Sequence, residues 1–345
     1  MTISEIAKRA GVSSAAVSRY FNKGYISEEK REAIKKVVEE TGYQPSKQAA
    51  MLRTKKTKQI GFIIPRIDSS SMSRVVAGVY KSLEEKGYQV VLGVTMNNPD
   101  KELDYLAMFQ NKMVDGVIFS ASVVTEEHKK AMKEMEVPLV VLGQKISGQY
   151  CVYHDDYNSI REMTEHVLNK GAKNPGYIGF LEDDVATGKT RSKAFMDTIT
   201  EAGLSSCKKN YVVSHFSIND GYQQAKKLLT IDPTIDAILT ANDRIAIGAL
   251  KYVQDQGLRC PEDIMIAGHG DSITTIVTNP TISSIRVPYQ ESGEMAAEVL
   301  VDMIEGENKA VKEVMLGYSL IERESTGNSA YKHSWNQTKA VVQDL

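Results

Sequence analysis

The chain has 345 residues and a formal net charge of −2, and this length leaves room for two or three domains with a large buried core. It shows neither a secretory leader nor an apolar run long enough to span a bilayer, so we expect a cytoplasmic protein without a membrane partner. The three cysteines, Cys151, Cys207 and Cys260, are far apart and lack metal-ligand spacing, which favours reduced thiols over a disulfide framework or a metal site.

The segment from Thr2 to Asn22 predicts two short helices joined by a tight turn. Apolar residues recur at helical spacing on both sides of Gly11, and Thr2 and Ser13 are good N-caps. Gly11 readily adopts the positive φ that such a turn needs. Two short helices joined in this way form a helix-turn-helix, whose second helix enters the major groove of DNA. Its outward side chains are predicted to be Ser14, Ala15, Ser18 and Arg19. A plain helical hairpin within a bundle is the alternative.

A third helix is predicted to begin at Ser27 and to end before Gly42, so that Ile34, Val37 and Val38 close a three-helix core. The following residues 46–52 form at most a helix too short to stand alone in water. This segment is either a plain linker or a hinge that folds only when a partner holds it. The basic residues here favour DNA as that partner, namely Lys47, Arg53, Lys55, Lys56 and Lys58.

The distribution of charge supports the same interpretation. Residues 1–58 hold 13 Lys+Arg against 6 Asp+Glu, whereas the rest of the chain holds 29 against 38. A small basic head on an acidic body is typical of a module that meets a phosphate backbone.

The run from Thr2 through AGVSSAAVSR, SEEKREAI, GYQPS and AAMLRTKKT closely resembles the DNA-binding head and hinge helix of the Lac repressor/galactose repressor family. The resemblance implies a homodimeric transcriptional repressor that binds a near-palindromic operator. It also implies that the leucine matching Leu52 wedges into a minor-groove step and kinks the DNA. The residues that it assigns to DNA are Thr2, Ser13, Ser14, Ala15, Ser18, Arg19, Asn22, Lys47, Leu52 and Arg53.

From Gln59 onwards, short apolar runs alternate with amphipathic stretches such as 73–87 and 101–113. This alternation predicts parallel sheets covered on both faces, with too many units for one compact sheet. We therefore expect an α/β body of two doubly wound subdomains over residues 59–327, whose facing strand ends make a closing cleft. The body resembles the periplasmic-binding-protein-like effector domain of the same family. There the chain crosses between lobes three times, which implies crossings near Asn158, Arg286 and Leu320.

The tail, residues 328–345, contains no sustained heptad. A tetramer-forming leucine zipper is therefore not evident there.

Candidate effector-binding residues follow the predicted strands. Arg66, Asp68 and Ser69 lie on a polar loop after IGFIIP, where a solvated loop is the alternative, and Gln144 follows PLVVLG. Arg191 falls in the first turns of a predicted helix, where a positive charge opposes the helix dipole, so an acceptor is expected from elsewhere.

The family resemblance adds further residues to this cleft. It implies that Arg191 reaches into the cleft and that Phe216, Asn242 and Asp271 supply an aromatic face, an amide and a carboxylate. These groups suit sugar hydroxyls, since buried polar groups must be satisfied. For Phe216, packing in the core is the alternative.

Within the family, the stretches RIDSSS, CVYHDD and DVATGKTR are similar to those of the trehalose-repressor-like branch. Where that branch recognises a phosphorylated disaccharide, it has an arginine at the position of Gln144 and an acid at the position of Met72. Both are missing here. We therefore expect a disaccharide effector or its phosphate, such as trehalose or trehalose 6-phosphate, with a weaker preference for the phosphate. Sucrose, maltose or another carbohydrate is the alternative.

An enzyme is disfavoured, and no cofactor is expected. Gly188–Thr190 resembles the end of a P-loop, but Asp183 stands where that loop needs a glycine and would repel phosphates. His154 with its neighbouring aspartates, and His269 with Asp271, lack the spacing of metal or hydrolase motifs. The second alternative is a sugar-binding protein without a regulatory role, against which the basic head argues.

Overall fold

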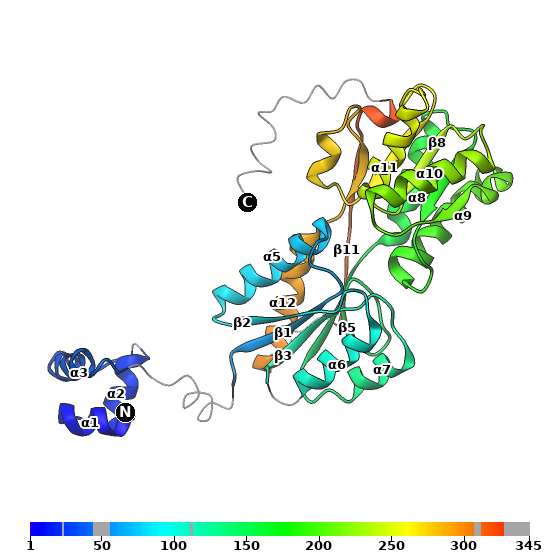
Figure 1. The fold of residues 1–345 in the computed structure, drawn as a ribbon. Helices are drawn as coiled ribbons and strands as arrows, with labels where there is room; N and C mark the ends of the chain where they lie inside the picture. The colour runs from blue at the N-terminus through cyan, green and yellow to red at the C-terminus, as the bar shows by residue number, and fades with distance from the viewer. Residues whose placement is uncertain (23, 44–55, 111–112, 307–311, 328–345) are drawn as a thin grey trace. The chain divides into compact units, whose positions relative to one another are not determined.

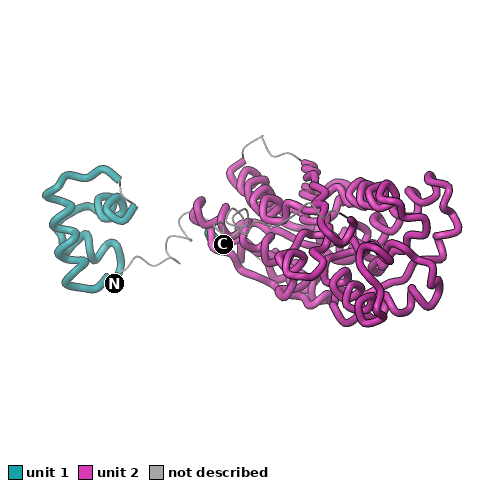
Figure 2. Tube along the Cα trace, turned by 90° about the horizontal axis from the view of Figure 1, so that it is seen from above, with its two compact units in different colours: residues 1–58 teal, residues 59–345 magenta. Residues whose placement is uncertain are grey.

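The computed structural model describes residues 1–22, 24–43, 56–110, 113–306 and 312–327. The chain divides into two compact units, residues 1–58 and residues 59–345 (Figure 2). The predicted hinge helix at 46–52 and the tail at 328–345 lie outside the described residues.

The first unit contains three helices, α1 (Ile3–Ala10), α2 (Ser14–Phe21) and α3 (Glu28–Thr41). Thr2 and Glu5 form a capping box at the start of α1, in which the Thr2 amide donates to Glu5 Oε2 over 2.8 Å. Gly11 ends the helix with a φ of 66°, and Ser13 caps α2, as the sequence predicts. The expected core is also confirmed, because Ile6, Val17 and Ile34 are fully buried and pack together across the three helices.

The second unit contains two lobes, each built on a twisted sheet (Figure 1). In the first lobe the strand order is β11-β5-β4-β3-β1-β2, and neighbouring strands run parallel. The strands are β1 (Gln59–Ile64), β2 (Gln89–Val94), β3 (Gly116–Ser120), β4 (Leu139–Leu142), β5 (Tyr150–His154) and β11 (Glu313–Leu316).

Helices cover both faces of this first sheet because successive strand side chains point to opposite sides. Phe62 and Ile64 of β1 pack under α5 (Ser70–Glu85) and α12 (Tyr289–Glu305). Ile63, between them, packs under α6 (Pro99–Gln110) and α7 (Glu126–Lys133). The predicted stretches 73–87 and 101–113 correspond to α5 and α6, and α5 begins earlier than predicted because Ser69 caps it.

The second lobe has the strand order β12-β10-β9-β8-β6-β7, with only the β10–β12 pair antiparallel among the described strands. Its strands are β6 (Pro175–Gly179), β7 (Tyr211–Val213), β8 (Ala237–Thr240), β9 (Met265–His269), β10 (Ser283–Arg286) and β12 (Ser319–Ile321). Its α-helices are α8 (Asp156–Asn169), α9 (Arg191–Glu201), α10 (Ile218–Ile231) and α11 (Asp243–Asp255). Its short helical turns are η1 (Val185–Thr190), η2 (Ser205–Lys209), η3 (Ile273–Ile276) and η4 (Glu324–Thr326).

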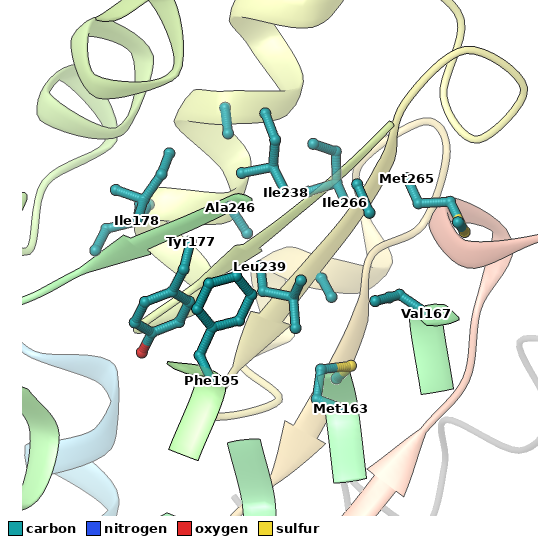
Figure 3. Packing of buried hydrophobic residues seen from close by; sticks show 14 of the residues in the cluster. Met163, Val167, Tyr177, Ile178, Phe195, Ile238, Leu239, Ala246, Met265 and Ile266 are labelled. Atoms are coloured by element: carbon teal, nitrogen blue, oxygen red, sulfur yellow. The ribbon is translucent and has the colours of Figure 1, made fainter. Parts of the chain in front are cut away.

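The core of this lobe lies on both sides of its sheet (Figure 3). Tyr177 of β6 stacks on Phe195 of α9, with ring centroids 5.2 Å apart, whereas the neighbouring Ile178 points to the opposite side with Ile238. On that opposite side α10 and α11 cross so closely that a Cβ at Gly248 would lie 2.0 Å from the Ile218 carbonyl oxygen.

The chain passes between the lobes three times. It does so between β5 and α8 at Asp155, between β10 and α12 at residues 287–288, and between β11 and β12 at residues 317–318. These crossings lie close to the expected positions Asn158, Arg286 and Leu320. The arrangement brings the carboxyl ends of the parallel strands of both lobes to face one another.

Candidate functional site

The helical head exposes one side of α2. Ser14, Ala15 and Arg19 are exposed, Ser18 is half-buried, and the opposite side of the helix carries the buried Val17. This is the orientation that the sequence predicts for a recognition helix. Contact with DNA by these side chains stays a prediction.

Three other head residues assigned to DNA have structural partners. The Thr2 hydroxyl caps α1, and the Ser13 hydroxyl accepts a hydrogen bond from the Ala16 amide over 3.2 Å. Asn22 is exposed at the end of α2, and its side-chain amide donates to the Ser18 carbonyl over 2.8 Å. The hinge residues Lys47, Leu52 and Arg53 lie outside the described residues.

A cavity of about 520 Å³ lies between the two lobes of the body, at the carboxyl ends of their strands. Its volume falls within the range typical of small-molecule sites, about 300–1,000 Å³. Of the eight predicted effector residues, six line it: Arg66, Ser69, Gln144, Arg191, Phe216 and Asn242.

The other two, Asp68 and Asp271, do not line the cavity, and arginines of the protein engage both carboxylates. Asp68 is paired with Arg66. Asp271 accepts from Arg286 Nε over 2.7 Å and from Arg323 Nη2 over 2.5 Å, and its side chain is only 7% exposed. The expected contact between the Asp271 carboxylate and a sugar is therefore not made available in this structure.

Arg191 is neutralised within the protein. Its Nε and Nη2 lie 2.7 and 2.6 Å from Asp156 Oδ1, its Nη1 donates to the Ala241 carbonyl over 2.7 Å, and both charged side chains are 7% exposed. Burial disfavours the charge on Arg191, but Asp156 overcomes this and raises the pKa of the guanidinium. The acceptor that the sequence left unidentified is thus Asp156, the first residue of α8. Because of this pair, Arg191 brings no uncompensated charge to the cavity.

Arg66 is neutralised in a similar way. Its Nε and Nη2 form two parallel hydrogen bonds with the Asp68 carboxylate, over 2.8 and 2.6 Å. This fork-shaped pair uses the geometry by which arginine binds phosphate. The hydrogen bond to Asp68 raises the pKa of Arg66, so the pair stays ionised.

Gln144 presents an oxygen rather than donors. Its Nε2 donates to the carbonyls of Ala121 and Ser122, over 2.9 and 2.8 Å, which accounts for both amide protons. Within the described residues its Oε1 accepts no hydrogen bond. The amide atom left for a ligand is therefore an acceptor, which suits a hydroxyl donor and repels a phosphate oxygen.

The second lobe supplies an aromatic wall and a donor. Phe216 stacks on Phe180, with ring centroids 3.8 Å apart and planes at 14°, and both rings line the cavity. Asn242 caps α11 by accepting from the Ile245 amide over 2.9 Å, which leaves its side-chain NH₂ as a donor. An aromatic wall, the Asn242 donor on the same lobe and the Gln144 acceptor on the other lobe suit a sugar ring and its hydroxyls.

Several cavity residues were not predicted. Phe180 directly follows β6, and Asp156 follows β5 after one residue, so the rule that singled out Gln144 could have found them. Asp184 and Tyr289 carried no such signal. Burial raises the pKa of Asp184 to about 6, and it lowers the pKa of His154, which meets Tyr289 edge-to-face, to about 4.

The described residues hold no group of three or more His, Cys, Asp or Glu side chains placed to bind a metal ion. None of the helices in the described part of the chain is long and apolar enough to cross a membrane.

Comparison with known proteins identifies the family of the chain. Residues 2–46 match the family model for bacterial regulatory proteins of the lacI family, and residues 164–326 match the model for the periplasmic binding protein-like domain. The chain is 31% identical over 307 residues to the sucrose operon repressor of Staphylococcus xylosus, covering 88% of this chain and 93% of that protein. The chain belongs to the lacI family.

This lacI-family protein also resembles other regulators along nearly its whole length. It is 29% identical over 330 residues to catabolite control protein A of Priestia megaterium, covering 94% of this chain and 99% of that protein. Among solved structures, the Lac repressor dimer bound to operator matches with a TM-score of 0.86 at 21% identity, covering 94% and 99% of the two chains. A complex of the transcriptional regulator CelR with cellobiose matches with a TM-score of 0.73 at 25% identity and the same coverage. The protein is thus a DNA-binding transcriptional regulator and not an enzyme.

Proposed function

We propose that this regulator is a homodimeric repressor whose heads bind a near-palindromic operator and whose cavity binds a disaccharide effector or its phosphate. Trehalose and trehalose 6-phosphate are the first candidates, and sucrose and maltose follow. The names of two similar proteins, a sucrose operon repressor and a CelR–cellobiose complex, refer to disaccharides and support this class of effector.

The observation that carries the proposal is the chemistry of the cavity. Arg66 and Arg191 are each paired with a carboxylate of the protein, and Gln144 offers an oxygen where a phosphate would need donors. A charge-assisted hydrogen bond contributes about 1.5–3 kcal/mol. Its absence at Gln144 lowers the affinity for a phosphosugar by about one to two powers of ten.

The proposal couples sugar binding to DNA binding. The effector contacts both lobes and so changes the angle between them, which moves the two hinges of a dimer. The effector and the operator then change each other's affinity by the same factor, typically about 1–3 kcal/mol in free energy.

Calorimetry of the full chain with trehalose, sucrose, maltose and their 6-phosphates tests the choice of effector. We expect at least one parent disaccharide to bind, with its 6-phosphate favoured little or not at all. Nanomolar binding of a phosphosugar with no detectable binding of its parent would contradict the proposal. An operator is then selected from random DNA with the full chain. The affinity of the protein for this operator should change when the sugar that binds in calorimetry is added.

A further inference from the structure

A buried acid–base pair lies beneath the part of the cavity formed by the first lobe. Glu102, in the first turn of α6, and His128, in the first turn of α7, both have fully buried side chains. Glu102 Oε2 lies 3.3 Å from His128 Nε2. Neither residue lines the cavity, so neither can contact an effector directly.

The hydrogen bonds of His128 fix which nitrogen faces the acid. The Thr125 amide donates to His128 Nδ1 over 3.3 Å, which makes Nδ1 an acceptor and assigns the ring proton to Nε2. His128 Nε2 lies beside Glu102 Oε2, although within the described residues neither atom forms a hydrogen bond. The imidazole ring also stacks parallel to Phe119, with centroids 6.0 Å apart.

One residue links this buried pair to the cavity. Ser122 lines the cavity, and its hydroxyl donates to Glu102 Oε1 over 2.9 Å. The backbone carbonyl of the same residue accepts from Gln144 Nε2 over 2.8 Å. The Glu102 carboxylate thus fixes the loop after β3 through the Ser122 hydroxyl, and the Ser122 carbonyl in that loop fixes the Gln144 amide.

We propose that Glu102 is a positioning residue for effector specificity, which acts through Ser122 to turn the Gln144 amide oxygen towards the cavity. If the loop were not held, the amide could rotate and present its NH₂ group to a phosphate. The buried pair then sets how strongly the neutral sugar is preferred over its phosphate. This inference rests on the proposed function of the cavity.

The position of the pair argues for this role rather than for stability. Burial of polar groups costs desolvation, and replacement of a buried polar pair by apolar side chains of similar volume is often neutral or stabilising. One side-chain hydrogen bond of the pair joins His128 to Thr125, the N-cap of α7, and the other, from Ser122 to Glu102, reaches the cavity wall.

Two variants remove the link, and the second of them also removes the buried carboxylate. Ser122→Ala deletes the hydroxyl, and Ser122→Thr retains it as the conservative rescue. The double variant Glu102→Met/His128→Phe replaces both buried partners by apolar side chains and does not alter any residue that lines the cavity. Asp104→Asn, at an exposed position on the same helix, is the matched control.

The measured quantity is the ratio of dissociation constants, that of the neutral sugar divided by that of its 6-phosphate. It is determined for the disaccharide, among trehalose, sucrose and maltose, that binds the parent chain most tightly. We expect Ser122→Ala and the double variant to raise this ratio about five-fold, the equivalent of one net hydrogen bond. Ser122→Thr and Asp104→Asn should leave it unchanged. If the pair only stabilised the fold, both affinities would change together and the ratio would stay constant, which would overturn the inference.

A second readout needs no ligand. In protein with ¹⁵N-labelled glutamine, the side-chain NH₂ signals of Gln144 are identified by their loss in Gln144→Met. We expect slow proton exchange in the parent and in Ser122→Thr, and faster exchange in Ser122→Ala and in the double variant. Failure of every sugar to bind would refute the proposed function alone, whereas unchanged exchange in both variants would refute the positioning role.

Discussion

Substitution of Asp156 by Asn tests how the charge on Arg191 is compensated. The substitution retains the size of the side chain but removes the charge that faces two guanidinium nitrogens in a nearly buried pair. Removal of one partner from a buried ion pair costs about 3–5 kcal/mol, because the other charge stays buried and unpaired. We expect a loss near the lower end of this range, since the asparagine oxygen still accepts one hydrogen bond.

The same change should alter which ligand stabilises the protein. With Arg191 unpaired, an anionic sugar supplies the missing charge, and a ligand at 100 times its dissociation constant stabilises the native state by about 2.7 kcal/mol. Asp156→Asn should therefore be stabilised more by a sugar 6-phosphate than by the neutral sugar at equal concentration. The parent should show little of this difference.

Urea unfolding followed by far-ultraviolet circular dichroism, with and without each sugar, measures both effects. Glu165→Gln is the matched control, since Glu165 lies on the same helix and forms an exposed ion pair with Arg161. Unchanged stability of Asp156→Asn, alongside an unchanged control, would show that the pair does not compensate a buried charge. Equal stabilisation by the two sugars would show that Arg191 does not face the ligand.

Four further predictions follow from the head, the hinge and the cavity. Arg19→Ala should weaken operator binding by about 1–3 kcal/mol, with a much smaller effect on nonspecific DNA at the same salt concentration; equal losses would assign Arg19 to the DNA backbone. Leu52→Ala should weaken operator binding and reduce the DNA bend, and a bend equal to that of the parent in a gel-shift bending assay would rule out the wedge. Gln144→Arg should shift calorimetric affinity towards the 6-phosphate, and an unchanged preference would place Gln144 away from the phosphate. Because burial holds the pKa of His154 at about 4, below its usual 6.5, the unfolded chain takes up the proton first as the pH falls. The free energy of unfolding should therefore fall between about pH 6.5 and pH 4, and less steeply in His154→Gln. Equal slopes for the two proteins in urea titrations would refute this.

Local signals in the sequence determined the elements of the head. Thr2, Gly11 and Ser13 act on backbone groups within a few residues of themselves, so their roles as caps and turn follow from neighbouring positions alone. The same is true of the strands of the body, whose apolar runs identify them without any knowledge of their partners. The rule that ligands bind at the carboxyl ends of parallel strands then placed Gln144 at the cavity, whereas Phe216 was predicted from the family resemblance.

The tertiary structure alone decided which charges in that cavity are free. Arg191 pairs with Asp156 across 35 positions of the chain, and Asp271 pairs with Arg323 across 52. An ion pair depends on distance in space: Arg191 meets Asp156 because α9 packs on α8, and Asp271 meets Arg323 because the chain returns from the first lobe to the second. For the same reason the Gln144 amide, whose two carbonyl partners lie on another strand's loop, shows its oxygen rather than its donors only in the folded protein.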